Sequence, residues 1–74
     1  MISPPGATIH DLLEESNLSN AWLATQLQLS FKEVRALLIG ELPIDSALAD
    51  KLEVAFKTPA SFWLAREASY RNQP

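Results

Sequence analysis

Two short helical segments separated by about three residues constrain the fold of this chain more than any other feature of its sequence. Ser19 is a favourable N-cap for a helix on which Leu23 and Leu27 share one face. Ser30 is a favourable N-cap for the next helix, and Glu33, three residues further on, completes a capping box. A turn of this length is typical of two helices that cross steeply in a helix-turn-helix. The sequence therefore predicts a helix-turn-helix formed by the second and third of its helices.

The segment before this motif predicts one further helix. Two adjacent prolines are expected to prevent an early helix start, so residues 1–6 form an extended lead. From about residue 7 to residue 16 the apolar residues Ile9, Leu12 and Leu13 fall at helical spacing. We therefore expect the folded domain to begin at residue 7.

Two more helices are expected after the motif, beyond a loop at residues 40–45. Asp45 is a suitable N-cap for the fourth helix, and Thr58 is a suitable N-cap for the fifth, with Pro59 at its first position. The fold class is therefore all-α with five helices, in which residues 7–71 form one domain and residues 72–74 a tail. Shared helical phase predicts a core that contains Ile9, Leu12, Leu23, Leu27, Val34, Leu37, Leu48, Leu52, Phe56, Phe62 and Trp63.

Composition excludes several classes of function. The chain of 74 residues has no cysteine and one histidine, His10, so it cannot build a cysteine or histidine metal site, and no metal or cofactor is expected. Its adjacent carboxylates, such as Glu14 and Glu15, diverge on a helix, and no nucleophile accompanies a base, so it is not expected to be an enzyme. The apolar runs are too short to span a membrane, which makes a cytoplasmic location the expectation.

The sequence also resembles a known family. Residues 18–44 read LSNAWLATQLQLSFKEVRALLIGELPI, Pro5-Gly6 precedes the first helix, and residues 60–71 read ASFWLAREASYR. Together these segments resemble the XRE (Cro/phage repressor-like) helix-turn-helix family, and most of all the HigA-type antitoxins and related prophage regulators. The resemblance implies a five-helix, lambda-repressor-like DNA-binding domain. It further implies a homodimer that binds operator DNA, often represses its own operon and is often paired with a cognate toxin.

The candidate DNA-binding residues follow from helical phase and from the motif. In a helix-turn-helix, the N-terminal half of the second helix enters the major groove. Lys32 and Ala36 are expected to point furthest outward from the apolar stripe, with Phe31 and Arg35 beside them. Helix N-termini also favour phosphate, and the resemblance implies an amide on phosphate at one such position. The predicted DNA-binding set is Asn20, Ser30, Phe31, Lys32, Arg35 and Ala36.

Candidate partner-binding residues lie elsewhere. Trp22 is expected to be exposed, because it falls away from the apolar stripe of its helix, and exposed tryptophans often anchor interfaces. Leu64 and Ala68 lie on the expected outer face of the fifth helix, where they could bind a second copy of the chain. Phe31 has three open interpretations: a core-edge residue, a contact for a thymine methyl group, or a contact for a protein.

The charge pattern leaves a second function open. Nine acidic residues outnumber six basic ones, whereas phosphate contacts normally require a basic surface. Glu41 stands in a loop where the resembled family usually has a basic residue, and Gln28 stands at a turn position that is usually glycine, where a left-handed backbone would be strained. The main hypothesis is a sequence-specific transcriptional regulator. The alternative is a protein-interaction module on the same scaffold, with weak or no DNA binding.

Overall fold

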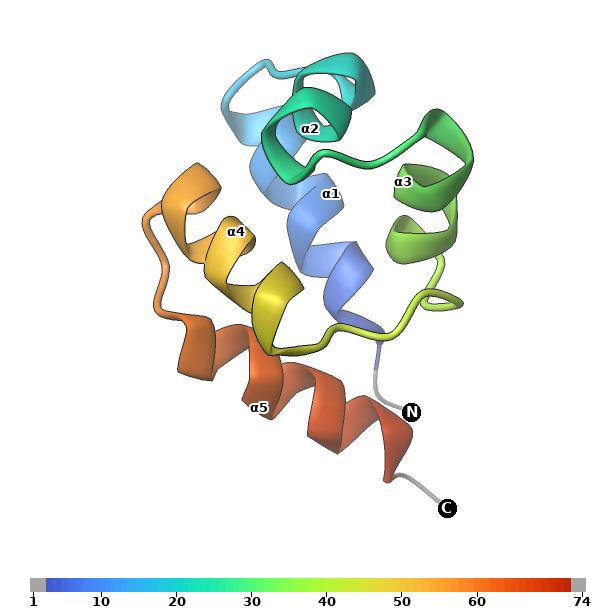
Figure 1. Cartoon of the computed structure of the whole chain (residues 1–74), viewed down its shortest axis with the longest axis vertical. Coiled ribbons are helices and arrows are strands. Elements are labelled where there is room, and N and C mark those ends of the chain that lie inside the picture. The colour runs from blue at the N-terminus through green and yellow to red at the C-terminus, as the bar shows by residue number, and fades with distance from the viewer. Residues whose placement is uncertain (1–2, 73–74) are drawn as a thin grey trace.

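A computed structural model describes residues 3–72 of the chain, and within that range the fold is all-helical, with no strand. The five helices are α1 (Pro5–Glu15), α2 (Asn20–Leu27), α3 (Phe31–Leu38), α4 (Ser46–Phe56) and α5 (Ala60–Arg71). In Figure 1, α1 lies in the middle of the molecule, with α2 above it, α4 and α3 on its two sides, and α5 below. No helix among the described residues is both long enough and apolar enough to cross a membrane.

Local capping confirms three of the expected helix starts. The Ser19 hydroxyl accepts a hydrogen bond from the backbone N–H of Trp22, at 3.1 Å. The Ser30 hydroxyl accepts from the N–H of Glu33, whose carboxylate in turn accepts from the N–H of Ser30, so the capping box is complete. The Asp45 carboxylate accepts from the N–H of Leu48 at 2.8 Å. These bonds satisfy donors that have no partner inside their own helix.

Two helix starts differ from the prediction. Helix α1 begins at Pro5 rather than at residue 7, because proline is tolerated at the first helical position, where its missing N–H has no partner to lose. Helix α5 begins at Ala60, and Thr58 does not cap it. The Thr58 hydroxyl donates to the carbonyl of Phe56, and the first N–H of α5 is instead satisfied by the Glu53 carboxylate at 2.8 Å.

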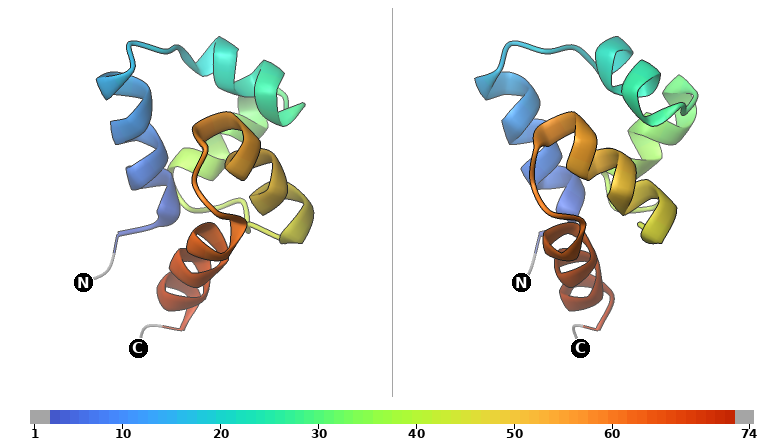
Figure 2. Two further views of the ribbon diagram at one scale, coloured as in Figure 1. Left: turned by 90° about the vertical axis from the view of Figure 1, so that its left-hand side faces the viewer. Right: turned by 60° about the vertical axis from the view of Figure 1, so that its left-hand side comes forward.

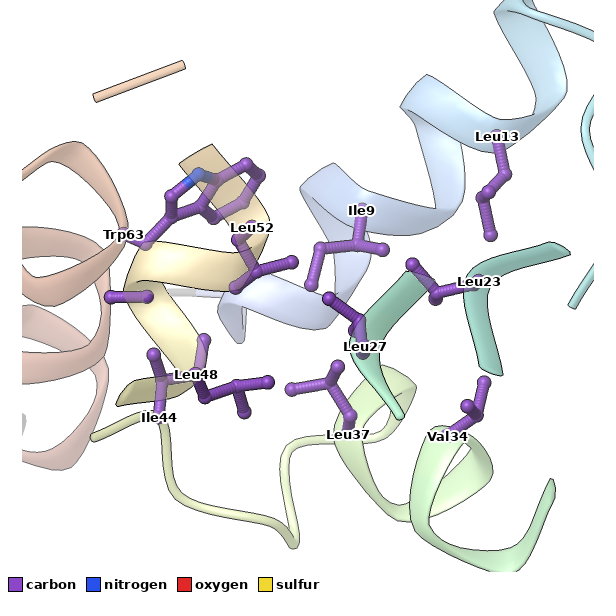
Figure 3. Close-up of a cluster of buried hydrophobic side chains, with 11 residues drawn as sticks. Ile9, Leu13, Leu23, Leu27, Val34, Leu37, Ile44, Leu48, Leu52 and Trp63 are labelled. Carbon is purple, nitrogen blue, oxygen red and sulfur yellow. The ribbon is translucent and has the colours of Figure 1, made fainter. Parts of the chain in front are cut away.

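The core lies where the helices converge, and it contains most of the predicted residues. Figure 3 shows apolar side chains from all five helices and from the loop before α4 pointing toward one another. Its buried members are Ile9, Leu13, Leu23, Leu27, Val34, Leu37, Ile44, Leu48, Ala49, Leu52 and Trp63. Helix α4 packs against both α2 and α5, and α1 packs against both α3 and α5, so each helix contributes to one continuous core.

Three predicted core residues lie further out than expected. Leu12 and Phe56 are only half-buried, and Phe62 is 40% exposed. The Phe62 ring meets the edge of the Trp63 ring with centroids 5.0 Å apart, so it covers the core rather than entering it. The prediction missed Leu13, Ile44 and Ala49, because their burial depends on how α1, the loop before α4 and α4 itself approach their neighbours.

The C-terminal helix is fastened to distant parts of the chain by polar contacts. Both views of Figure 2 show α5 beneath the other four helices. Arg71 donates to the carbonyl of Gly40 at 2.7 Å and to the carboxylate of Glu67 at 2.9 Å. Arg66 donates to the hydroxyl of Thr8 at 2.8 Å. These bonds connect α5 to the chain that follows α3 and to α1, so α5 is an integral part of the domain.

Gln28 adopts the left-handed backbone conformation that the sequence predicted to be strained, with φ of 56° and ψ of 43°. A residue with a Cβ atom is destabilised there by about 1–2 kcal/mol. We therefore expect Gln28→Gly to raise the free energy of unfolding by about 1 kcal/mol, as measured by urea denaturation. Gln28→Ala is the matched control, since it removes the side chain but keeps the Cβ atom, and no gain is expected from it. Equal stability of the two variants would contradict the account.

Candidate functional site

The outward face of α3 carries the candidate site. At 100° per residue, Phe31, Lys32 and Arg35 fall within one arc of the helix, and all three side chains are exposed. Val34 and Leu37 point the opposite way and are each 1% exposed. Because the buried stripe fixes the rotation of α3, it also holds the two cations on the solvent side. Figure 1 shows α3 at the right-hand edge of the molecule, away from α5.

Ala36 departs from the prediction, since it is half-buried rather than fully outward. The chain folds back after α3, and the backbone N–H groups of Glu41 and Leu42 both donate to the carbonyl of Ala36, at 2.8 and 3.2 Å. This return covers part of the alanine. A shallow hollow remains on the surface, and it is lined by Lys32, Arg35, Ala36, Ile39 and Glu41.

Ser30 holds the start of α3 in place. Its hydroxyl accepts from the N–H of Glu33 and its own N–H donates to the Glu33 carboxylate at 3.0 Å, so this N–H is not available to a phosphate. The backbone N–H groups of Phe31 and Lys32 belong to the first turn of α3, where no helical carbonyl can accept from them. The hydrogen bond from the Ser30 backbone, followed by that from its side chain, holds the pKa of Glu33 below its ordinary value of 4.5.

The lowered pKa of Glu33 predicts a pH dependence of stability. A carboxylate whose pKa is lowered by folding stabilises the protein above its unfolded pKa, and this contribution is lost as the pH falls through the folded pKa. We expect wild type to be more stable than Glu33→Gln near pH 7, with a difference that shrinks below about pH 4.5. Urea denaturation of both proteins between pH 7 and pH 3 measures it. A difference that stays constant over this range would contradict the assignment.

Asn20 lies at the first position of α2, directly after the Ser19 cap, and it is exposed. Its side chain therefore stands at a second helix N-terminus, a position that favours anions because the N–H groups of the first turn point outward there. The structure thus exposes five of the six predicted DNA-binding residues, with Ala36 as the exception.

Trp22 was predicted to be exposed, but it is half-buried. Its ring packs on the ring of Phe56 with centroids 5.8 Å apart, and Phe56 in turn contacts Trp63 at 6.0 Å. Trp22 therefore extends an aromatic row that begins in the core. The sequence could not show this row, because it depends on the end of α4 reaching the side of α2.

The charged side chains of α5 border its outer face and are engaged in contacts with other side chains or with the backbone. Arg66, Glu67 and Arg71 of this helix form the contacts to α1 and to Gly40 described above. The other exposed residues of α5 up to position 70 are uncharged, and they are Ser61, Phe62, Leu64, Ala65, Ala68 and Ser69. Leu64 and Ala68 are thus exposed, as the sequence predicted. The uncharged face contains more than those two residues, because the prediction had placed Phe62 in the core.

One exposed residue near the candidate site, Ile39, was not singled out as a contact by the sequence. Ile39 is the C-cap of α3 and is 55% exposed, and Glu41 follows it on the rim of the hollow. Helical phase alone could have found Ile39, because it lies between Arg35 and Lys32 on the same arc. The hollow itself forms only because the chain turns back at Gly40, whose φ is 85°.

Comparison with known proteins adds a fold but no function. The chain is similar to a hypothetical protein from E. coli whose crystal structure is known, with a TM-score of 0.86 and 26% sequence identity. The similarity covers 96% of this chain and 74% of that one. No protein-family model and no curated protein matches the chain.

Proposed function

We propose that this chain is a sequence-specific DNA-binding regulator of transcription, built on a lambda-repressor-like helix-turn-helix in which α3 enters the major groove. The observation that carries the proposal is the exposed pair Lys32 and Arg35 on the outward face of α3, beyond the three-residue connection from α2. An α-helix with exposed cations fits the major groove, where arginine and lysine bind guanine edges.

The N-terminal ends of α2 and α3 support the same proposal. Asn20 and the first-turn N–H groups of Phe31 and Lys32 are suited to phosphate oxygens on either side of the groove. The capping box holds the backbone at the start of α3 in place, so this backbone needs little ordering on binding. Because the exposed cations are few, the affinity of one chain for DNA is expected to be low and its salt dependence shallow.

A mobility-shift titration with the duplex upstream of the protein's own gene tests this proposal, with a scrambled duplex as reference. We expect wild type to prefer the upstream duplex, and Lys32→Ala to weaken binding and reduce the salt slope by about 1 for each half-site. Glu41→Lys should strengthen binding, because it replaces the anion beside the basic pair. Asp50→Lys on α4 is the matched control: it makes the same charge change at another exposed site. If Lys32→Ala binds as well as wild type, α3 is not the reading element.

We further propose that the regulator is a homodimer formed through the outer face of α5. Phe62 and Leu64 are 40% and 36% exposed on this face. The exposed residues that lie between them around the helix are serines and alanines. A second copy is the simplest partner for such a face, since two-fold dimers are the commonest assemblies. Two half-sites one helical turn apart, about 34 Å, would then act as a single stronger site.

Sedimentation over a micromolar concentration range tests the dimer. Wild type is expected to become dimeric as its concentration rises, whereas Leu64→Glu should stay monomeric because it brings two charges into the interface. Val54→Glu is the control, since it makes the same kind of change on α4 at a residue that is 77% exposed. A wild type that stays monomeric throughout would refute this part of the proposal.

A protein-interaction module is the second candidate function. It is favoured by two exposed apolar side chains near the basic pair, Phe31 at 67% and Ile39 at 55%, and by the acidic balance of the chain. Large apolar groups on a small surface often mark a protein contact. Failure of wild type to bind any duplex, even at low salt, would favour this candidate over the first. An antitoxin role with a cognate toxin rests on the family resemblance alone.

A further inference from the structure

We infer that Phe31 determines operator specificity by contacting the C5-methyl group of a thymine in the major groove. The inference rests on the proposed function, because it needs α3 to lie in that groove. Phe31 is 67% exposed and is the first residue of α3. In a helix-turn-helix, the N-terminal part of this helix approaches the base edges most closely.

Phe31 stands apart from the other phenylalanines and tryptophans of the described chain. Trp22, Phe56, Phe62 and Trp63 form a continuous row of ring contacts, with centroids between 5.0 and 6.0 Å apart. Within residues 3–72, no such ring contact involves Phe31. Its exposure therefore has no explanation in the packing of this domain, and the ring is free to bury its apolar surface against a ligand.

The neighbours of Phe31 restrict what that ligand can be. Lys32 and Arg35 are exposed on the same arc of α3, so any surface that meets the ring also meets two positive charges. A duplex supplies phosphates for the cations, and its major groove presents one apolar group, the thymine methyl, to the ring. A purely apolar protein pocket would fit the ring but would leave both cations without partners.

The helix geometry also separates the roles of the three side chains. At 100° per residue, Arg35 lies about 40° from Phe31 and Lys32 about 100° from it. Arg35 is therefore the cation that can reach the same base step as the ring, whereas Lys32 points toward one wall of the groove. The preferred sequence should thus contain a thymine next to a guanine, read by Phe31 and Arg35.

Replacing thymine by deoxyuridine tests the inference, because it removes only the methyl group. Duplexes that bind the wild-type chain are first selected from a random library, and each enriched thymine is then replaced in turn. We expect one replacement per half-site to weaken wild-type binding about fourfold, the effect of one buried methyl group. The two bases should bind Phe31→Ala equally well. Phe31→Leu, which keeps an apolar side chain, should retain a preference for thymine.

Val54→Ala is the control, since it truncates another exposed apolar side chain, on α4, and should leave the thymine-to-deoxyuridine ratio unchanged. Selection of no duplex would overturn both this inference and the proposed function. Selected duplexes that lack an enriched thymine, or that bind equally well with deoxyuridine, would overturn the inference and leave the proposed function intact. A deoxyuridine effect of the same size in Phe31→Ala would also overturn it, because another residue would then contact the methyl group.

Discussion

Replacing Leu37 by alanine is expected to lower the free energy of unfolding by about 2–5 kcal/mol. Leu37 is 1% exposed and lies on the inward face of α3, in the core shared by all five helices. Truncation removes its burial and leaves a cavity that the surrounding helices can fill only in part. A domain of this size has a total stability of roughly 4–11 kcal/mol, so the variant should lose a large share of it.

Thermal and urea denaturation of Leu37→Ala measure this loss. Val54→Ala is the matched control, because Val54 is an aliphatic residue of α4 that is 77% exposed, and its truncation should change stability by no more than about 0.5 kcal/mol. A Leu37→Ala variant that melts with the wild type would show that α3 is rotated differently. Lys32 and Arg35 would then lose their place on the outer face.

Gly6→Ala is expected to destabilise the protein by about 1–3 kcal/mol, although alanine normally favours a helix. Gly6 is buried in α1, where the backbones of α1 and α3 approach each other closely. A Cβ atom at this position would overlap the carbonyl oxygens of Leu37 and Leu38 and would lie 2.6 Å from the carbonyl carbon of Leu38. Since these are backbone atoms, no side chain can move aside, and the two helices must separate.

The neighbouring residue provides the control for Gly6→Ala. Ala7 is half-buried in the same turn of α1, and Ala7→Gly should cost up to about 1 kcal/mol through helix propensity alone. Alanine is therefore expected to be the better residue at position 7 and the worse one at position 6. Urea denaturation of the two variants should therefore show that each is less stable than wild type, although one gains an alanine and the other loses one. A gain in stability from Gly6→Ala would mean that α1 and α3 are further apart than described.

Features set by neighbouring residues could be predicted from the sequence. The caps at Ser19, Ser30 and Asp45 depend on residues three positions away, and all three are present. Helical phase also predicted that Lys32 and Arg35 would be exposed, because the apolar stripe of α3 fixes their direction. Local rules were sufficient wherever the deciding interaction stays within one helix.

Features set by distant contacts could not be predicted in this way. Thr58 looked like a cap, but the carboxylate of Glu53 takes that role because the end of α4 lies beside the start of α5. Trp22 looked exposed until Phe56 covered part of it. The bond from Arg71 to Gly40 joins residues 31 positions apart, and neither residue carries a local signal for it. The errors at Thr58 and Trp22 reflect tertiary packing that overrides a local preference, and the bond from Arg71 to Gly40 has no local signal that could have predicted it.

Chemical-shift mapping of the isotope-labelled chain, titrated with its selected duplex, tests most directly whether α3 is the DNA-reading helix. The account predicts that the largest shifts fall at Asn20 and at residues 30–36, and that they disappear when Lys32 and Arg35 are both replaced by alanine. Shifts confined to Asp11, Glu14 and Glu15 of α1 or to the outer face of α5, or no shifts at millimolar concentrations of duplex, would contradict the account.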